Sequence, residues 1–459
     1  MDLLRSFAAA LLAFGCGGVR GEAPSDPAAA ERTGLAEKSE GPAVKPALAA
    51  SGAPREEPVT EVCPRRPLVG QALAVRSTSE LGVVAGKRWV VATLAERPVL
   101  LHLGPAGALT HAPLSRWTED VAPEGEGMRL FFTGPPRARW SRVELADRDA
   151  PREGADVPLA ELVPGEYPKG VASDGTRALV SLYRSGERGY EGDTFLLEIP
   201  SGRRRARAGV TVWTAQCLGG RCFGVATENA DPEVRALVEV SDAGARRVGA
   251  LGRWNCSGAE TWRQGESWLV AWSERGAVGV AALDLRSGAL VQAQIPASEG
   301  TCPSVQALAV GGRRGVVVGA AGGGKAFVPV GPGVALGAAE ALPAFTGARQ
   351  IFAEAGSGAL VLDFTAAAGM VHGPEDPSGM REYHEVWSFS GRHGLLRRGA
   401  RGWELSAEGP LPHDGTRGEF SRGFDVYALT RPGHAGALMV ADAGESAYYP
   451  LLGPCAEAR

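Results

Sequence analysis

Short apolar stretches alternate with tight turns over most of the chain, and the pattern is clearest between Glu260 and Pro296. Four strands are predicted there, each separated from the next by a gap of three to five residues that contains a turn: Thr261–Arg263, Trp268–Trp272, Val278–Leu285 and Ala289–Ile295. In the last strand, Val291, Ala293 and Ile295 alternate with Gln292 and Gln294. This period of two is typical of a strand with one buried face. The stretch therefore predicts a unit of four antiparallel strands.

The same unit recurs along the chain. A glycine turn is expected after the third strand of several units, at Gly107, Gly202, Gly244, Gly288, Gly333 and Gly444. The steps from Gly202 to Gly244, Gly288 and Gly333 are 42, 44 and 45 residues. A repeat of four strands in about 40 to 50 residues is the signature of a β-propeller blade.

Eight strongly apolar strands follow a first strand and a tight turn. They are Trp89–Thr93, Met128–Thr133, Ala178–Tyr183, Cys222–Thr227, Trp268–Trp272, Gly315–Gly319, Ala359–Phe364 and Phe424–Leu429. We predict an all-β fold for residues 62–459: a single β-propeller with eight blades of four-stranded antiparallel sheets, preceded by a disordered tether. Seven blades is the alternative if the weak second unit or the stretched seventh unit forms no complete sheet.

The first 15 residues have the plan of a secretory signal peptide: Arg5 near the start, an apolar run from Phe7 to Phe14, and a small residue before Cys16. Ala13-Phe14-Gly15-Cys16 resembles the lipobox of bacterial lipoproteins, although leucine is usual where Ala13 stands. The resemblance implies that a lipid is attached to Cys16 after the signal is removed. A plain secretory signal, with Cys16 incidental, is the alternative.

Residues 16–61 are predicted to be the lipidated cysteine and a disordered tether. From Gly17 to Glu61 the chain has no aromatic residue and is dominated by Ala, Pro, Gly and Glu, a composition that cannot bury enough apolar surface to offset the entropy of ordering. Gly17 stands where lipoproteins retained at the inner membrane have aspartate, so the resemblance implies the outer membrane. No apolar run is long enough for a spanning helix, so the lipid would be the sole membrane attachment.

Six cysteines follow the tether, and an even number in an exported chain suggests disulfides, although six cysteines allow 15 pairings. Cys217 and Cys222 flank a Gly219-Gly220 turn, which places them opposite each other with α-carbons about 4.5 Å apart. Cys256 and Cys302 are 46 residues, one repeat, apart. Cys63 and Cys455 remain, at the two ends of a region whose closed ring would bring its termini together. We therefore predict the pairs Cys217–Cys222, Cys256–Cys302 and Cys63–Cys455.

Motifs and charge disfavour a nucleotide or nucleic-acid site and leave one segment as a candidate metal site. Gly319–Ala326 nearly matches a phosphate-binding loop, but Ala326 replaces the Ser/Thr that would ligate magnesium and the prolines that follow prevent a helix. A formal charge of -4 provides no basic field for nucleic acid. The insertion 366–385 reads as a solvated loop, with divalent-metal binding the alternative for its acidic and histidine residues: His372, Glu375, Asp376, His384 and Glu385. No cofactor is predicted.

The predicted insertions share one position. Between the second and third strands the chain lengthens at Arg184–Asp193, Glu228–Arg235, Ala366–Glu385 and Arg431–Gly436, whereas the turns between first and second strands stay short. In a propeller these loops lie on one face with the blade-to-blade connections. We predict a binding face there, using aromatic residues, Arg and His of the kinds enriched at binding hot spots: Trp117, Tyr190, Trp254, Arg349, Tyr383 and His384. For each residue, the alternative is that it seals a loop against a blade.

The folded region resembles bacterial β-propeller lipoproteins in general. Ser173-Asp174-Gly175-Thr176-Arg177 looks like the turn of TolB-type periplasmic repeats, whereas the signatures of WD40, sialidase and kelch blades are absent, so no subfamily is assigned. Two functions compete because a propeller does not imply one. The first is a noncatalytic binding or assembly module of the cell envelope with a protein or glycan partner. The second is an exported enzyme, a glycan or peptide hydrolase or lyase with its site in the central channel.

Overall fold

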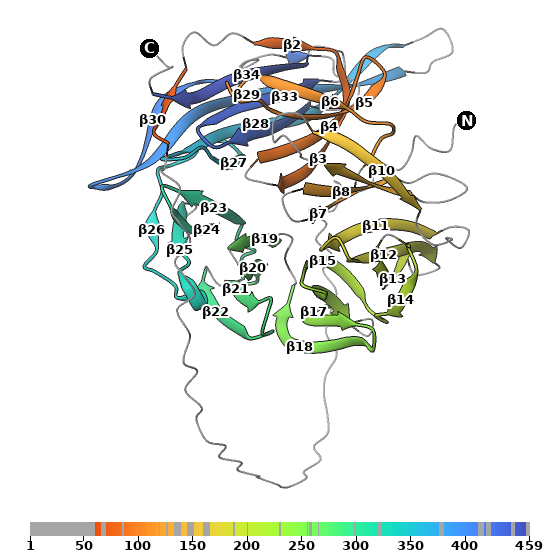
Figure 1. Cartoon of the computed structure of the whole chain (residues 1–459). Coiled ribbons are helices and arrows are strands. Elements are labelled where there is room, and N and C mark those ends of the chain that lie inside the picture. Colours follow the sequence, from red (N-terminus) through yellow and green to blue (C-terminus); the bar gives the residue numbers. More distant parts are fainter. Residues whose placement is uncertain are drawn as a thin grey trace, which may run out of the picture. The chain divides into compact units, whose positions relative to one another are not determined.

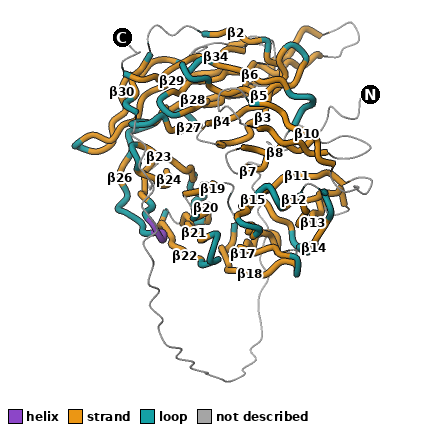
Figure 2. The backbone as a smooth tube through the Cα atoms, viewed as in Figure 1, coloured by secondary structure: helices purple, strands orange, loops and turns teal. Residues whose placement is uncertain are grey.

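The computed structural model describes most of the chain after residue 59. The described residues are 60–65, 70–84, 87–118, 120–124, 127–132, 139–144, 151–158, 166–186, 189–199, 201–228, 231–254, 256, 259–264, 266–297, 300–319, 324–375, 381–411, 417–418, 424–441 and 446–455. They consist of strands and loops with one short 3₁₀ helix, η1 (Pro332–Val334) (Figure 2). Cys16, the predicted signal peptide and nearly all of the predicted tether lie outside them.

These residues form eight antiparallel sheets. Sheet 1 comprises β3 (Val75–Val84), β4 (Lys87–Leu94), β5 (Arg97–Leu103) and β6 (Leu109–Pro113). Sheet 2 comprises β7 (Asp120–Glu124), β8 (Gly127–Phe132), β9 (Arg139–Glu144) and β10 (Arg152–Pro158). Sheet 3 comprises β11 (Glu166–Ser173), β12 (Arg177–Gly186), β13 (Gly189–Glu198) and β14 (Arg204–Arg207). Sheet 4 comprises β15 (Thr211–Leu218), β16 (Arg221–Glu228), β17 (Asp231–Ser241) and β18 (Gly244–Arg253).

The chain continues in the same way. Sheet 5 comprises β19 (Ala259–Gln264), β20 (Ser267–Glu274), β21 (Ala277–Asp284) and β22 (Leu290–Pro296). Sheet 6 comprises β23 (Val305–Val310), β24 (Arg313–Gly319), β25 (Lys325–Pro329) and β26 (Glu340–Ala341). Sheet 7 comprises β27 (Arg349–Glu354), β28 (Ala359–Glu375), β29 (Arg381–Gly399) and β30 (Gly402–Pro410), and the short β31 (Arg417–Gly418) pairs with β29. Sheet 8 comprises β32 (Phe424–Arg431), β33 (His434–Ala441) and β34 (Ser446–Pro454), joined by β1 (Val62–Pro64) and β2 (Gln71–Leu73).

Sheet 5 matches the four strands predicted between Glu260 and Pro296. Its middle strands, β20 and β21, are buried along six consecutive positions each, because neighbouring sheets pack against both faces of sheet 5. The outer strand β22 alternates as expected at Ala293, Gln294 and Ile295. Val291, expected on the buried side, is 47% exposed, because it lies near the beginning of an outer strand.

The hydrophobic core is divided into clusters between neighbouring sheets. Phe223 and Leu237 of sheet 4 pack with Trp268 and Val270 of sheet 5. Sheets 6 and 7 share another cluster that contains Phe327 and Phe352. A further cluster joins Val90 and Leu101 of sheet 1 to Leu429 and Leu438 of sheet 8. The first and last sheets of the described region are therefore packed together.

Sheet 8 corrects the prediction for the last unit. Phe424–Leu429, expected to be the second strand, lies in the first strand β32, and β33 and β34 follow as the second and third. The fourth position is filled by β1 from the other end of the chain, where Cys63 pairs with Gly453; Figure 1 shows the orange β2 beside the blue β34 of the same sheet. Arg431–Gly436 is therefore the hairpin between first and second strands rather than an insertion. Gly444, predicted in a turn after a third strand, lies outside the described residues, in the segment between the second strand β33 and the third strand β34.

The structure contains the three disulfides that the sequence predicts. Their α-carbons lie 4.7 Å apart in Cys63–Cys455, 4.1 Å in Cys217–Cys222 and 5.4 Å in Cys256–Cys302. Cys217 is directly opposite Cys222 in the ladder, and both residues of the intervening turn have positive φ, 59° at Gly219 and 80° at Gly220, as a type I′ hairpin requires.

The insertion 366–385 was expected to be a loop, and this was wrong for its described part. β28 and β29 extend together as a long two-stranded ribbon, whose pairing continues from Phe364 and Gly391 to His372 and Tyr383. Val386, Trp387 and Phe389 in β29 are of the β-branched and aromatic types that favour strands. Asp376 lies outside the described residues.

Candidate functional site

The two ends of each sheet in the described region carry different turns and connections. One end has the hairpins between second and third strands and the connections from one sheet to the next; we call this the insertion face. The other end has the first-to-second and third-to-fourth turns, and we call it the opposite face. The folded unit begins on the opposite face, where the Thr60 carbonyl accepts a hydrogen bond (2.9 Å) from Ser357 N–H in the turn between β27 and β28.

A row of aromatic rings crosses from sheet 4 to sheet 5 on the insertion face. The Arg235 guanidinium lies 5.6 Å from the ring centroid of Trp213 and 5.4 Å from that of Trp254. Trp254 in turn stacks on Trp272, with centroids 6.1 Å apart and planes inclined by 17°. We call these four residues the tryptophan row.

The two ends of the row differ in exposure. Trp213 is 51% exposed, and its indole N–H donates to Thr227 Oγ1. Trp272 is only 2% exposed. Trp254, between them, is partly buried against the core of sheets 4 and 5, and its indole N–H has no hydrogen-bond partner among the described residues. Burial lowers the pKa of Arg235, but an arginine stays charged in proteins. Its guanidinium lies over the rings of Trp213 and Trp254, whose faces attract cations.

A pocket of about 390 Å³ adjoins the Trp272 end of the row, at the small end of the range for ligand pockets. Trp272 Nε1 donates to Glu274 Oε1 at 2.6 Å, and Glu274 lines the pocket with Gln292 and Gln294. Gly252 also lines it: a β-carbon there would lie 2.7 Å from the Glu274 carboxylate. Glycine at this position therefore leaves room for the carboxylate.

The structure assigns the predicted binding-face residues to different surroundings. Trp254 belongs to the tryptophan row, whereas Trp117 packs partly buried against the core between sheets 1 and 2. Arg349 is exposed at the beginning of β27. Tyr190 lies in β13 opposite Ser185, and Tyr383 and His384 lie in β29 opposite His372 and Val371.

Sequence reasoning missed Trp213, Arg235 and Trp272 as partners of Trp254. Trp213 and Trp272 lie within strands, where an aromatic residue is ordinarily part of the core. Their proximity arises from packing between two sheets and leaves no fixed spacing in the sequence.

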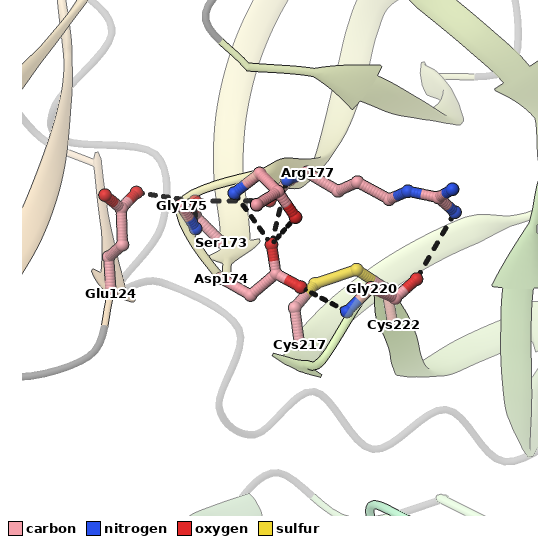
Figure 3. Close-up of a disulfide and its surroundings, with 9 residues drawn as sticks. Glu124, Ser173, Asp174, Gly175, Arg177, Cys217, Gly220 and Cys222 are labelled. Atoms are coloured by element: carbon pink, nitrogen blue, oxygen red, sulfur yellow. Dashed lines mark hydrogen bonds between the residues drawn. A yellow bond between two sulfur atoms is a disulfide. The ribbon is translucent and has the colours of Figure 1, made fainter.

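The opposite face has a hydrogen-bonded network around the TolB-like turn (Figure 3). Asp174 accepts the N–H groups of Thr176 (2.9 Å) and Arg177 (2.8 Å), and its other oxygen accepts Gly220 N–H (2.6 Å) in the disulfide-closed hairpin of sheet 4. Burial alone would raise the pKa of Asp174, but these backbone hydrogen bonds lower it. The network joins neighbouring turns and has the character of structural support.

Two other candidate sites can be compared with the structure. Lys325, from the near-match to a phosphate-binding loop, begins the strand β25 and donates to Ser304 Oγ at 2.9 Å. Within the ranges that the structure describes, no three His, Cys, Asp or Glu residues lie close enough together to hold a metal ion. In the same ranges, no helix has the length and apolar character needed to cross a membrane.

Comparisons with known proteins reveal similarity of fold alone. No family model matches the sequence, and no curated protein matches it. A structure from an analysis of two prolyl endopeptidases is 11% identical with a TM-score of 0.33, over 69% of this chain and 55% of its own. The WD40 domain of SCAP from fission yeast is 9% identical (TM-score 0.42; 86% of this chain, 94% of that one), and a putative TolB from Agrobacterium tumefaciens is 14% identical (TM-score 0.29; 50% and 84%). The chain thus spans about half the length of the prolyl endopeptidase it matches.

Proposed function

We propose that this protein is a lipid-tethered module of the cell envelope that binds an envelope protein or glycan, without catalysis, through the insertion face of a β-propeller. In this proposal Cys16 carries the lipid in the outer membrane, residues 16–61 form the tether, and the eight sheets are the blades of one closed ring.

Contacts between the first and last sheets support a closed ring. β1 completes sheet 8, Tyr448 Oη of that sheet donates to Gly107 O of sheet 1 at 3.0 Å, and Ser446 Oγ donates to Val75 O at 3.2 Å. Such a ring leaves few unpaired strand edges, which is how propellers avoid edge-to-edge aggregation.

The observation that carries the functional proposal is the tryptophan row. Trp213 leaves half of its surface in solvent, and Arg235 lies beside it. Trp and Arg are both among the residue types enriched at binding hot spots. Because the folded unit begins at Thr60 on the opposite face, a tether attached there leaves the insertion face accessible to a partner.

Photo-crosslinking in intact cells tests the proposal. A crosslinking amino acid is placed at Arg275, in the turn between β20 and β21 on the insertion face, or at Ser287, in the turn between β21 and β22 on the opposite face. Both positions are exposed and belong to sheet 5, so they form a matched pair. We expect a discrete adduct from Arg275 and none from Ser287. Adducts from Ser287 alone would show that the binding face is assigned wrongly.

A further inference from the structure

We propose that the tryptophan row and its adjoining pocket bind an oligosaccharide, which rests on the proposed function and specifies the class of ligand. Trp213, at the exposed end of the row, provides flat apolar surface, and the pocket provides hydrogen-bonding groups. Both lie at the same end of sheets 4 and 5, and Trp272 belongs to both.

The exposed ring of Trp213 suits the apolar face of a sugar. A pyranose ring has axial C–H groups on one face and hydroxyl groups around its edge, and the negative face of an indole attracts such weakly positive C–H groups. Trp213 is fixed for this contact because its N–H donates to Thr227 and its ring lies beside Arg235. A rigid aromatic side chain loses little conformational entropy when a ligand binds.

The pocket provides the polar groups that sugar hydroxyls need. The Glu274 carboxylate accepts one hydrogen bond from Trp272 and has further lone pairs for hydroxyl donors. Gln294 is exposed, and the Gln292 amide donates to Ala250 O at 2.7 Å, which leaves its carbonyl oxygen as an acceptor. Carboxylate and amide groups around a buried tryptophan suit a hydroxyl-rich ligand better than an apolar peptide side chain, which would leave them unpaired.

The dimensions favour a chain of sugars over a single one. Arg235 and Trp254 lie between Trp213 and Trp272 in the series of contacts. A ligand that contacts both Trp213 and the pocket must therefore extend past these two side chains, which favours more than one sugar unit. We therefore expect affinity to increase with chain length and then to level off.

Titration of the whole folded protein with defined oligosaccharides tests the inference. The probes are neutral hexose and N-acetylhexosamine oligomers of one to six units, followed by tryptophan fluorescence and calorimetry. Trp213→Ala should lower the affinity for the tightest-binding oligomer at least tenfold, whereas Trp213→Phe should retain most of that affinity. Glu274→Gln should weaken binding of the longer oligomers. Val291→Ala on sheet 5 is the matched control, since Val291 is the other large apolar residue that is exposed among the described residues, and it should bind like the parent.

Two results would overturn the inference: no oligomer binds at millimolar concentration, or Trp213→Ala binds all of them like the parent. If the oligomers fail but Arg275 crosslinks to an envelope protein, the proposed function stands and the oligosaccharide is wrong. If the oligomers bind in a Trp213-dependent way and crosslinking isolates no protein, the inference is supported and the ligand is a glycan.

Discussion

A comparison of how much each of the three disulfides stabilises the fold tests the connection between the chain ends. In the chain-entropy model, the stabilisation increases with the logarithm of the loop that a disulfide closes. The sequence separations are 392 residues for Cys63–Cys455, 46 for Cys256–Cys302 and 5 for Cys217–Cys222. The corresponding upper estimates at 25 °C are about 6, 4 and 2 kcal/mol.

The three paired Cys→Ala variants, purified from an oxidising compartment, should therefore lose free energy of unfolding in that order. Urea unfolding measures the loss, and a similar dependence on urea in all variants would show that the same surface is exposed in each. The parent protein with its disulfides intact is the reference. If removal of Cys63–Cys455 costs no more free energy than removal of Cys217–Cys222, the pairing of β1 with β34 does not join the chain ends in the folded protein.

Three further predictions concern the anchor and the polar networks. Cys16→Ala should abolish incorporation of labelled fatty acid and release the protein from membranes; retained label would refute lipidation at this residue. Glu340 accepts hydrogen bonds from Arg313 (2.7 Å), Arg398 (2.9 Å) and Trp403 (2.8 Å), and the first two guanidinium groups lower its pKa to about 2. The ionised Glu340 should contribute on the order of 1 to 2 kcal/mol to the free energy of unfolding after solvent screening. This contribution should be complete above pH 4.5 and be lost as the pH falls towards 2. Glu340→Gln should remove this pH dependence from the measured free energy of unfolding. Asp174→Ala should cost about 1 to 3 kcal/mol because three backbone N–H groups lose their acceptor, whereas Asp242→Ala, at an exposed carboxylate, should change thermal unfolding little.

The sequence predicts those features that depend on local chemistry. The four strands of sheet 5 follow from alternation and glycine turns, and the Cys217–Cys222 pairing follows from a two-residue Gly-Gly hairpin. The strand positions in sheet 8 are each predicted one place too late, because its fourth strand comes from residues 62–64 at the other end of the chain. A local sequence pattern cannot show that a distant segment completes the sheet. For the ribbon of sheet 7 the sequence predicts a loop, because Pro374 and Pro377 suggest irregular structure. In the structure, strand-forming residues such as Val386 and Trp387 continue the pairing.

The candidate site was predicted only in part for a similar reason. Trp254 was chosen because aromatic residues in sheet-to-sheet connections favour binding, yet the structure places it partly within the core. Its substitution would therefore affect both folding and binding. Trp213 is the better probe because its side chain is exposed. Its position beside Arg235 could not be predicted from spacing, because the two residues lie two strands apart in sheet 4 and meet only when β15, β16 and β17 pair.

Binding to isolated envelopes tests the central claim, that the insertion face is the working surface, most directly. The Cys16→Ala variant lacks the proposed lipid, so it can bind envelopes only through its folded region. The fraction that sediments with purified envelopes at increasing concentration gives a binding isotherm. On that background, Trp213→Ala should weaken binding by about thirtyfold, or on the order of 2 kcal/mol, while Arg203→Ala/Arg205→Ala on the opposite face should bind like the parent, with thermal unfolding unchanged in both. The account is contradicted if the arginine variant loses binding and Trp213→Ala retains it.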